Sequence, residues 1–138
     1  MSNPFVDTNV IIHLLTEDDP RKTAQAAALF QQLEAGTLLL EAPDTVIADA
    51  VYVLASPRLY AKPRAEVKEL LTPLVHLSGF RIRNKRAVLR ALELYGATAR
   101  LDFGDAMIVS TMEQTGSRDL YSYDRDFDRI PGITRVEP

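Results

Sequence analysis

The sequence contains no cysteine, and it has no apolar run long enough to cross a membrane. Without cysteine there can be no disulfide and no cysteine-ligated zinc, and this absence favours a cytosolic setting. A membrane span needs about 20 consecutive apolar residues. The first seven residues also lack the basic start and the apolar stretch of a signal peptide. We therefore expect a cytoplasmic protein that does not insert into a membrane.

The balance of charge is close to neutral, with a formal net charge of −3. Such a charge argues against a protein that coats nucleic acid without sequence preference. Of the 138 residues, 46 % are hydrophobic and 25 % are charged, which fits one globular domain over residues 1–138. One short stretch is locally basic, and it is either a set of RNA contacts or an ordinary solvated surface. Its members are Arg81, Arg83, Lys85, Arg86 and Arg90.

Short apolar segments alternate with segments of helical periodicity. Asp19-Pro20 and Asp102 are typical helix starts, and Gly36 and Gly116 are typical helix ends. This alternation indicates parallel strands joined by right-handed crossovers. The expected fold is therefore α/β, a three-layer α/β/α domain with a short, mainly parallel central sheet, and ligands should bind beyond the carboxyl ends of its strands. The expected strands are 5–7, 38–40, 80–82, 120–123 and 133–136, and the expected helices include 10–15, 46–55 after a cap at Asp44, a helix capped by Asn84, and 103–114.

Four aspartates stand in unusual surroundings. Asp7 lies between apolar neighbours, and Asp49 is the only charge in a helix that is apolar nearly all round. A helix of that kind is expected to be buried, and an ionised carboxylate inside it costs several kcal/mol unless it is paired or bound to a metal. No lysine or arginine lies three or four residues from Asp49. Asp105 precedes an apolar helical run, and Asp124 follows an apolar strand.

The four carboxylates are expected to converge at one edge of the sheet. Asp7 and Asp124 follow strands, whereas Asp49 and Asp105 lie near the starts of helices that should begin at the same edge. Carboxylates gathered in this way repel one another, and a hard divalent cation removes the repulsion. Magnesium prefers such oxygen ligands and completes its shell with water and phosphate oxygens. This pattern is typical of a site that hydrolyses phosphodiester bonds.

Each acid also has an ordinary structural interpretation. Asp7 could cap the helix that follows it, Asp105 could pair with Asp102 in a capping arrangement, and Asp124 could start a turn. The residues beside the acids could orient a carboxylate or a metal-bound water, or they could be turn residues. These neighbours are Thr8, Asn9 and Ser122.

The acidic segments resemble the four motifs of PIN-domain nucleases, in the same order and with similar spacing, from about residue 4 to residue 136. The segments are Phe5-Val6-Asp7-Thr8-Asn9, the acid of the helix that ends Val51-Tyr52-Val53-Leu54, Asp102-Phe103-Gly104-Asp105-Ala106, and Ser122-Tyr123-Asp124-Arg125-Asp126-Phe127. Among these nucleases, the short chain looks most like a VapC-type toxin of a bacterial toxin–antitoxin pair.

This resemblance implies an endoribonuclease that depends on Mg²⁺ or Mn²⁺ and acts on RNA as a homodimer. It also implies a cognate antitoxin that blocks the acidic site. The carboxylates that would hold the metal are Asp7, Asp49, Asp105 and Asp124, with Asp102 and Asp126 as supporting groups. One departure is Asp49, where the family usually has glutamate. The shorter side chain leaves open whether it reaches a metal directly or through water.

Two other acidic enzyme classes fit less well. A haloacid-dehalogenase-like phosphatase needs a second acid two residues after the first, where this chain has Asn9. A receiver domain needs a lysine late in the chain, and none follows Lys85. The remaining alternative is a PIN-like fold without catalytic activity that binds protein or RNA.

Overall fold

The computed structural model describes residues 2–138, which form six α-helices, four short strands and one 3₁₀ helix. The helices are α1 (Thr8–Leu15), α2 (Pro20–Glu34), α3 (Asp44–Ala55), α4 (Arg64–His76), α5 (Lys85–Ala97) and α6 (Phe103–Thr115). The strands are β1 (Leu40–Ala42), β2 (Phe80–Ile82), β3 (Asp119–Tyr121) and β4 (Thr134–Val136), and the 3₁₀ helix is η1 (Arg125–Arg129).

Most helix ends follow the predicted capping chemistry. The Asp19 carboxylate accepts a hydrogen bond from the Lys22 N–H at the start of α2, and Gly116 ends α6 with a φ of 77°. Two other predicted caps differ. Asp44 is the first residue of α3, after Pro43, so that cap is wrong. Asn84 occupies the predicted N-cap position of α5, but its side chain makes no capping bond. The Asn84 amide instead donates to the Asp44 carboxylate at 3.1 Å, so each side chain satisfies the other.

The strands are parallel, which confirms the predicted α/β class, but they form two separate sheets. Within residues 2–138, β1 pairs with β2 and β3 pairs with β4, and Phe5 adds a single parallel bridge to Glu41 beside β1. The predicted central sheet is therefore not continuous, because no pairing joins the strand at Phe5 to β3 in this part of the chain. Two strands also differ from their expected bounds. The strand expected at 38–40 is Leu40–Ala42, and the strand expected at 120–123 is Asp119–Tyr121.

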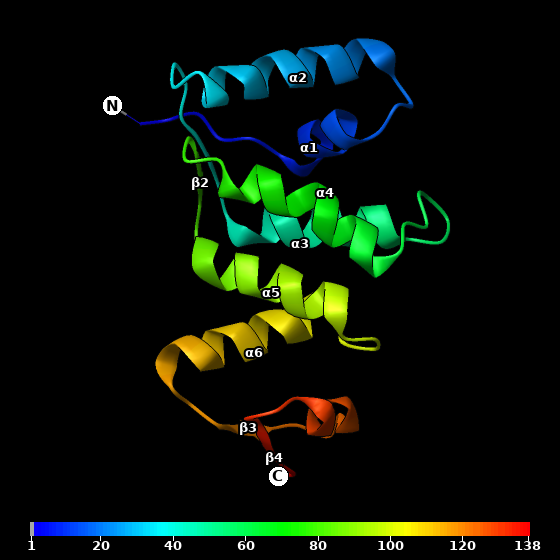
Figure 1. Ribbon diagram of the computed structural model, residues 1–138, viewed down its shortest axis with the longest axis vertical. Helices are drawn as coiled ribbons and strands as arrows, with labels where there is room; N and C mark the ends of the chain where they lie inside the picture. The colour runs from blue at the N-terminus through cyan, green and yellow to red at the C-terminus, as the bar shows by residue number, and fades with distance from the viewer. Residues whose placement is uncertain (1) are drawn as a thin grey trace.

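The helices stack along the long axis of the molecule, from α2 and α1 at one end to α6 at the other (Figure 1). Beyond α6 lies the C-terminal unit, which we define as β3, η1 and β4 (residues 119–136). Two of its side chains, Phe127 and Ile130, are buried in the common core. The start of the chain runs beside α1 and α2, so the N-terminal strand and the C-terminal unit lie far apart (Figure 1).

The core is centred on the elements between these two ends. Its largest fully buried side chains include Phe80 of β2, Ile47 of α3 and Leu92 of α5. Phe80 packs edge to face on Phe30 of α2, with ring centroids 5.6 Å apart, an arrangement that aromatic pairs favour. This pair joins the β1–β2 sheet to the α2 end of the molecule.

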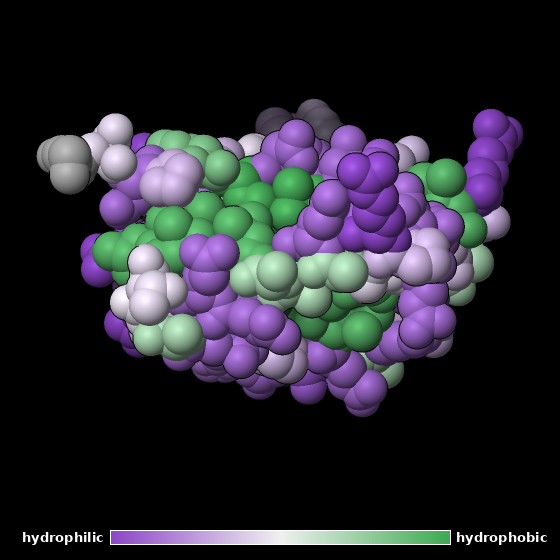
Figure 2. All heavy atoms as spheres, turned by 90° about the horizontal axis from the view of Figure 1, so that it is seen from above, coloured by the Kyte–Doolittle hydropathy of each residue, from purple (hydrophilic) through white to green (hydrophobic). Residues whose placement is uncertain are grey.

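The surface at the α2 end mixes polar and apolar side chains (Figure 2). The partly buried apolar residues of α1 and α2 are Val10, Leu14, Leu15 and Leu29. None of the helices in the described part of the chain is long and apolar enough to cross a membrane.

Candidate active site

Asp7 lies where the N-terminal strand turns into α1. Its carboxylate accepts a hydrogen bond from the Asn9 N–H at 3.0 Å and caps the helix, while the side chain stays exposed. The Thr8 hydroxyl donates to the Val46 carbonyl at 3.2 Å and ties this corner to the first turn of α3. Asp7 therefore has the capping role that the sequence allowed, and it also keeps carboxylate lone pairs free for a ligand.

The predicted burial of Asp49 is wrong. Helix α3 buries one face, including Ile47, Ala50 and Leu54, and it turns Asp49 and Tyr52 to solvent. Tyr52 is 76 % exposed and lies one turn after Asp49. Water hydrates the Asp49 carboxylate, which explains why no lysine or arginine is needed beside it.

Asp105 is the one aspartate of the four that is partly buried. Its N–H donates to the Asp102 carboxylate at 2.8 Å, so Asp102 caps α6 and holds the first turn in place. Burial raises the pKa of the Asp105 carboxyl above its ordinary value, and the negative charges of Asp102, Asp124 and Asp126 raise it further. These four acids thus lie within electrostatic range of one another.

Asp124 begins η1 and is held by its neighbours. Its N–H donates to the Ser122 hydroxyl at 3.0 Å, and its carboxylate accepts from the Asp126 N–H at 2.9 Å. Ser122 therefore fixes the backbone of Asp124 at this turn. The turn that the sequence allowed at this point is present, and the Asp124 side chain remains exposed.

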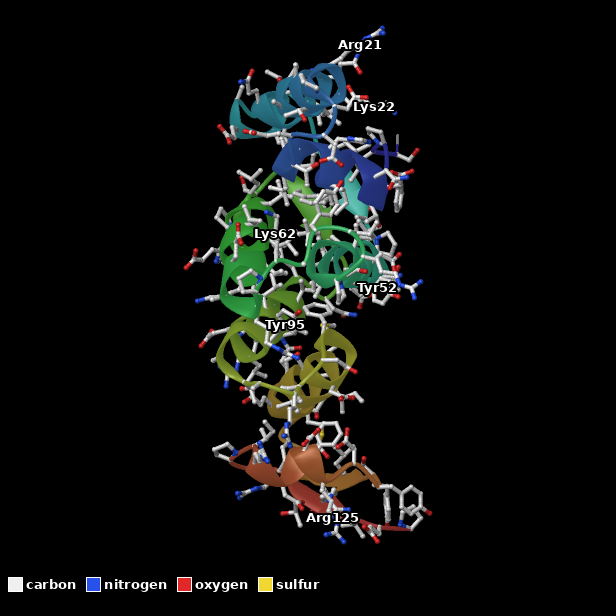
Figure 3. The ribbon with its side chains drawn as sticks, turned by 90° about the vertical axis from the view of Figure 1, so that its right-hand side faces the viewer. Arg21, Lys22, Tyr52, Lys62, Tyr95 and Arg125 are labelled. Atoms are coloured by element: carbon white, nitrogen blue, oxygen red, sulfur yellow. The ribbon has the colours of Figure 1, made fainter. Side chains whose placement is uncertain are left out.

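The four predicted ligands do not form one cluster. Asp105 lies near Asp102, Asp124 and Asp126, whereas Asp7 caps α1. Asp49 is exposed on α3, and its helix neighbours Ala48 and Tyr52 share a pocket with Asp102. Arg125, next to Asp124, lies at the opposite end of the molecule from Lys22 of α2 (Figure 3). Across residues 2–138, no three His, Asp or Glu side chains are close enough to hold a metal ion. The oxygen donors suit a hard cation, but their predicted convergence is not present within one chain.

A pocket of about 490 Å³ lies between α3 and the start of α6. Tyr52, Tyr95 and Asp102 line it together with Arg64, whose guanidinium lies 4.4 Å from the centre of the Tyr95 ring. Figure 3 places Tyr52 and Tyr95 in the middle of the molecule. Sequence reasoning missed this pocket, because its lining comes from α3, α4, α5 and the start of α6, and no local pattern shows that these helices meet.

The predicted basic strip is not a uniform surface. The Lys85 ammonium donates to the carbonyls of Leu77 and Phe80 at 2.7 and 2.8 Å. Burial lowers the pKa of Lys85, and the positive charge of Arg81 lowers it further. Lys85 thus closes the turn before β2. The exposed members are Arg81, Arg83 and Arg86, and the first two line a groove beside Phe5.

The family model of the PIN domain matches residues 5–133, which include all four predicted acids. The chain belongs to the PIN domain family. PIN domains are nuclease folds, generally hydrolases that use divalent metal ions, and the family assignment supports that class of chemistry here. A comparison with curated proteins finds no match.

Proposed function

We propose that this PIN domain is an endoribonuclease that uses Mg²⁺ or Mn²⁺ to hydrolyse RNA phosphodiester bonds. The observation that carries the proposal is the group of acids around Asp105, where burial and three neighbouring carboxylates disfavour the ionised form. A cation placed among these oxygens would relieve that cost. The proposed ligands are Asp7, Asp49, Asp105 and Asp124.

The chain's own groups would prepare this site. A bound divalent ion supplies a nucleophilic water and stabilises charge on the leaving oxygen. Asp102 fixes the first turn of α6 and thereby the direction of the Asp105 side chain. Ser122 fixes the backbone of Asp124, and Thr8 ties the Asp7 corner to α3. Because these supports are hydrogen bonds to the backbone, the carboxylates stay free for the metal.

The exposed arginines and an exposed aromatic ring are the proposed contacts to RNA. Arg81, Arg83 and Arg86 have solvent-facing charge for phosphates. Tyr52 presents its ring beside Asp49, and unstacked RNA bases bind such rings by stacking.

We expect Tyr52→Ala to weaken RNA binding about tenfold, because stacking of one base on an aromatic ring is worth about 1–3 kcal/mol. The KM for a single-stranded RNA should rise by that factor with little change in kcat. Tyr52→Phe keeps the ring and should bind as the parent does. An unchanged KM in Tyr52→Ala would show that RNA does not contact this face.

We also propose that the protein is the toxin of a toxin–antitoxin pair, acts in the cytoplasm, and is blocked by a cognate antitoxin. The support is the resemblance of its four acidic motifs to those of VapC-type toxins. Induced expression should arrest growth, and expression of Asp7→Asn should not. Normal growth with the active protein present at the same level would contradict the toxin role.

The assay for nuclease activity compares four samples. The protein is incubated with mixed RNA and Mn²⁺, with and without EDTA, beside Asp7→Asn under the same conditions. Cleavage that needs the metal and is lost in the variant supports the proposal. RNA that is bound but never cut would instead support the catalytically inactive binding module.

A further inference from the structure

The pocket between α3 and the start of α6 contains groups that the proposed hydrolysis does not use. Its lining includes three aromatic rings, those of Tyr52, Tyr95 and Phe103. The Tyr95 and Phe103 rings meet edge to face with centroids 6.4 Å apart, and both side chains are buried. Tyr52 is exposed on α3, in the middle of the molecule (Figure 3). The pocket therefore has two rings fixed by packing and a third that a planar ligand can reach from solvent.

Arg64 adds hydrogen-bond donors to this aromatic lining. Its Nη1 donates to the carbonyls of Tyr95, Thr98 and Leu101, and its guanidinium lies over the Tyr95 ring. Its Nε and Nη2 have no hydrogen-bond partner among residues 2–138, and neither atom is shut off from the surface. These two nitrogens carry three N–H donors in one plane. The guanidinium is thus held in place while part of its donor set stays free for a ligand.

Asp102 adds an acceptor to the same lining. Its Oδ1 accepts the Asp105 N–H, whereas its Oδ2 makes no hydrogen bond with residues 2–138. The ion pairs of the described chain do not include one between Asp102 and Arg64, although both side chains line this pocket. A donor fork and a carboxylate that share a pocket without meeting suit a ligand with acceptors on one edge and donors on another.

Among the bases of RNA, guanine matches these two groups best. Its O6 and N7 atoms are neighbouring acceptors, and arginine binds both in its commonest specific contact with a base. Its N1–H and N2–H groups are neighbouring donors, which suit a carboxylate. Adenine has an amino donor beside N7, and uracil has separated carbonyls, so neither gives the fork two neighbouring acceptors. Cytosine has neighbouring acceptors, but it has a single donor group and a smaller face for stacking.

The pocket also lies next to the proposed metal ligands along the chain. Ala48 lines it and precedes Asp49, and Gly104 lines it and precedes Asp105. A base held here would place its own ribose and phosphates beside these carboxylates. Single-stranded RNA can supply such a base, because its unstacked bases turn outward and stack on aromatic and arginine side chains.

We propose that this pocket binds one unstacked guanine of the RNA substrate, with O6 and N7 on Arg64, N1–H and N2–H on Asp102, and the base covered by Tyr52. The choice of RNA as the ligand rests on the proposed nuclease function, whereas the match to guanine rests on the groups that line the pocket. Arg64 and Asp102 are then the residues that select the base, and cleavage occurs beside guanine in single-stranded segments.

Binding without metal tests the pocket apart from catalysis. The trinucleotides UGU, UAU, UCU and UUU differ only in the central base, and EDTA prevents metal-dependent cleavage. We expect isothermal titration calorimetry to give a Kd for UGU that is lower than the other three by about tenfold or more, which is the discrimination of a good bidentate contact. Equal affinity for all four trinucleotides would overturn the proposal.

A pocket-filling substitution locates the bound guanine. Ala55 lines the pocket from the last turn of α3, so Ala55→Leu should fill it and remove the preference for UGU. Ala28→Leu makes the same change at an exposed position of α2 and should bind as the parent does. A preference for UGU that persists in Ala55→Leu would put the guanine site elsewhere and contradict the proposal.

Asp102→Asn tests recognition separately from the support of α6. Asparagine keeps an oxygen that can cap the helix, but it puts an amide donor in place of the second carboxylate oxygen. The Kd for UGU should rise about tenfold, to the level of UAU, while the affinity for UUU should not fall. The midpoint of thermal unfolding shows that the variant is folded. Parent-like selectivity in the folded variant would exclude the contact between Asp102 and guanine.

Cleavage then distinguishes this proposal from the nuclease function on which it rests. A parent that prefers UGU but cuts no RNA with Mn²⁺ retains the guanine pocket and loses the nuclease proposal. A parent that cuts RNA equally beside all four bases, and binds the four trinucleotides equally, retains the nuclease proposal and loses the guanine pocket.

Discussion

Asp105→Asn is expected to lower the kcat for metal-dependent RNA cleavage by about 1,000-fold or more. The substitution keeps the size of the side chain but removes the charge that would hold the metal in the most acidic part of the site. A loss of that size corresponds to about 4 kcal/mol of transition-state stabilisation, which is typical for removal of a group that acts on developing charge. Single-turnover cleavage at saturating Mn²⁺ measures it.

The fold should tolerate this change, since Asp102 contacts the backbone N–H of residue 105 and not its side chain. Glu69→Gln, at an exposed position of α4, removes one negative charge elsewhere and serves as the matched control. It should cut RNA at the parent rate. Full activity in Asp105→Asn would remove Asp105 from the proposed ligand set.

The same variant should be more stable than the parent at pH 7 without metal. The folded-state pKa of Asp105 is raised above the ordinary value of 3.8, so ionisation of this group destabilises the fold as pH rises through that range. Asparagine avoids the cost, and the midpoint of thermal unfolding should rise by on the order of 1–3 °C. The advantage should vanish well below pH 3.8, where both forms are neutral, and Mg²⁺ should raise the midpoint of the parent alone.

Phe80→Ala is expected to destabilise the protein by about 3–5 kcal/mol, because it leaves a cavity where a large buried ring was removed. Phe80 is 0 % exposed, and its ring packs on Phe30. The loss approaches the whole stability of a small domain, which is about 5–15 kcal/mol. Denaturant unfolding of the two proteins measures the difference.

Leu59→Ala provides the comparison, because Leu59 is largely exposed and its truncation leaves no cavity. Its unfolding midpoint should stay close to that of the parent. A loss below about 1 kcal/mol in Phe80→Ala would mean that the β1–β2 sheet and α2 do not share a tightly packed core.

Local signals in the sequence were sufficient for the helices and for the α/β class. The caps at Asp19 and Asp102 and the glycine after α6 depend on short-range hydrogen bonds and backbone conformation, which neighbouring residues determine. Asn84 occupies the N-cap position without a capping bond, because its backbone is left-handed (φ 58°) instead of extended. Its amide donates to Asp44, 40 positions away. Long-range partners of this kind leave no local pattern.

The candidate site shows the same limit on a larger scale. The sequence located the acids at strand and helix ends, and the structure places Asp7, Asp105 and Asp124 at such ends. It could not locate the break between the N-terminal strand and β3, because sheet pairing depends on segments over 100 residues apart. The exposure of Asp49 was missed for a related reason, since an apolar helix is buried only where other elements cover it.

Within residues 2–138, the strand at Phe5 pairs only with β1 and β3 pairs only with β4, so each keeps one open edge that matters at high protein concentration. A molecule with two such edges can match its copies head to tail, which produces open-ended rows instead of closed pairs. Arg118 and Asp119 put charges at the start of β3, and charges on an edge oppose such growth.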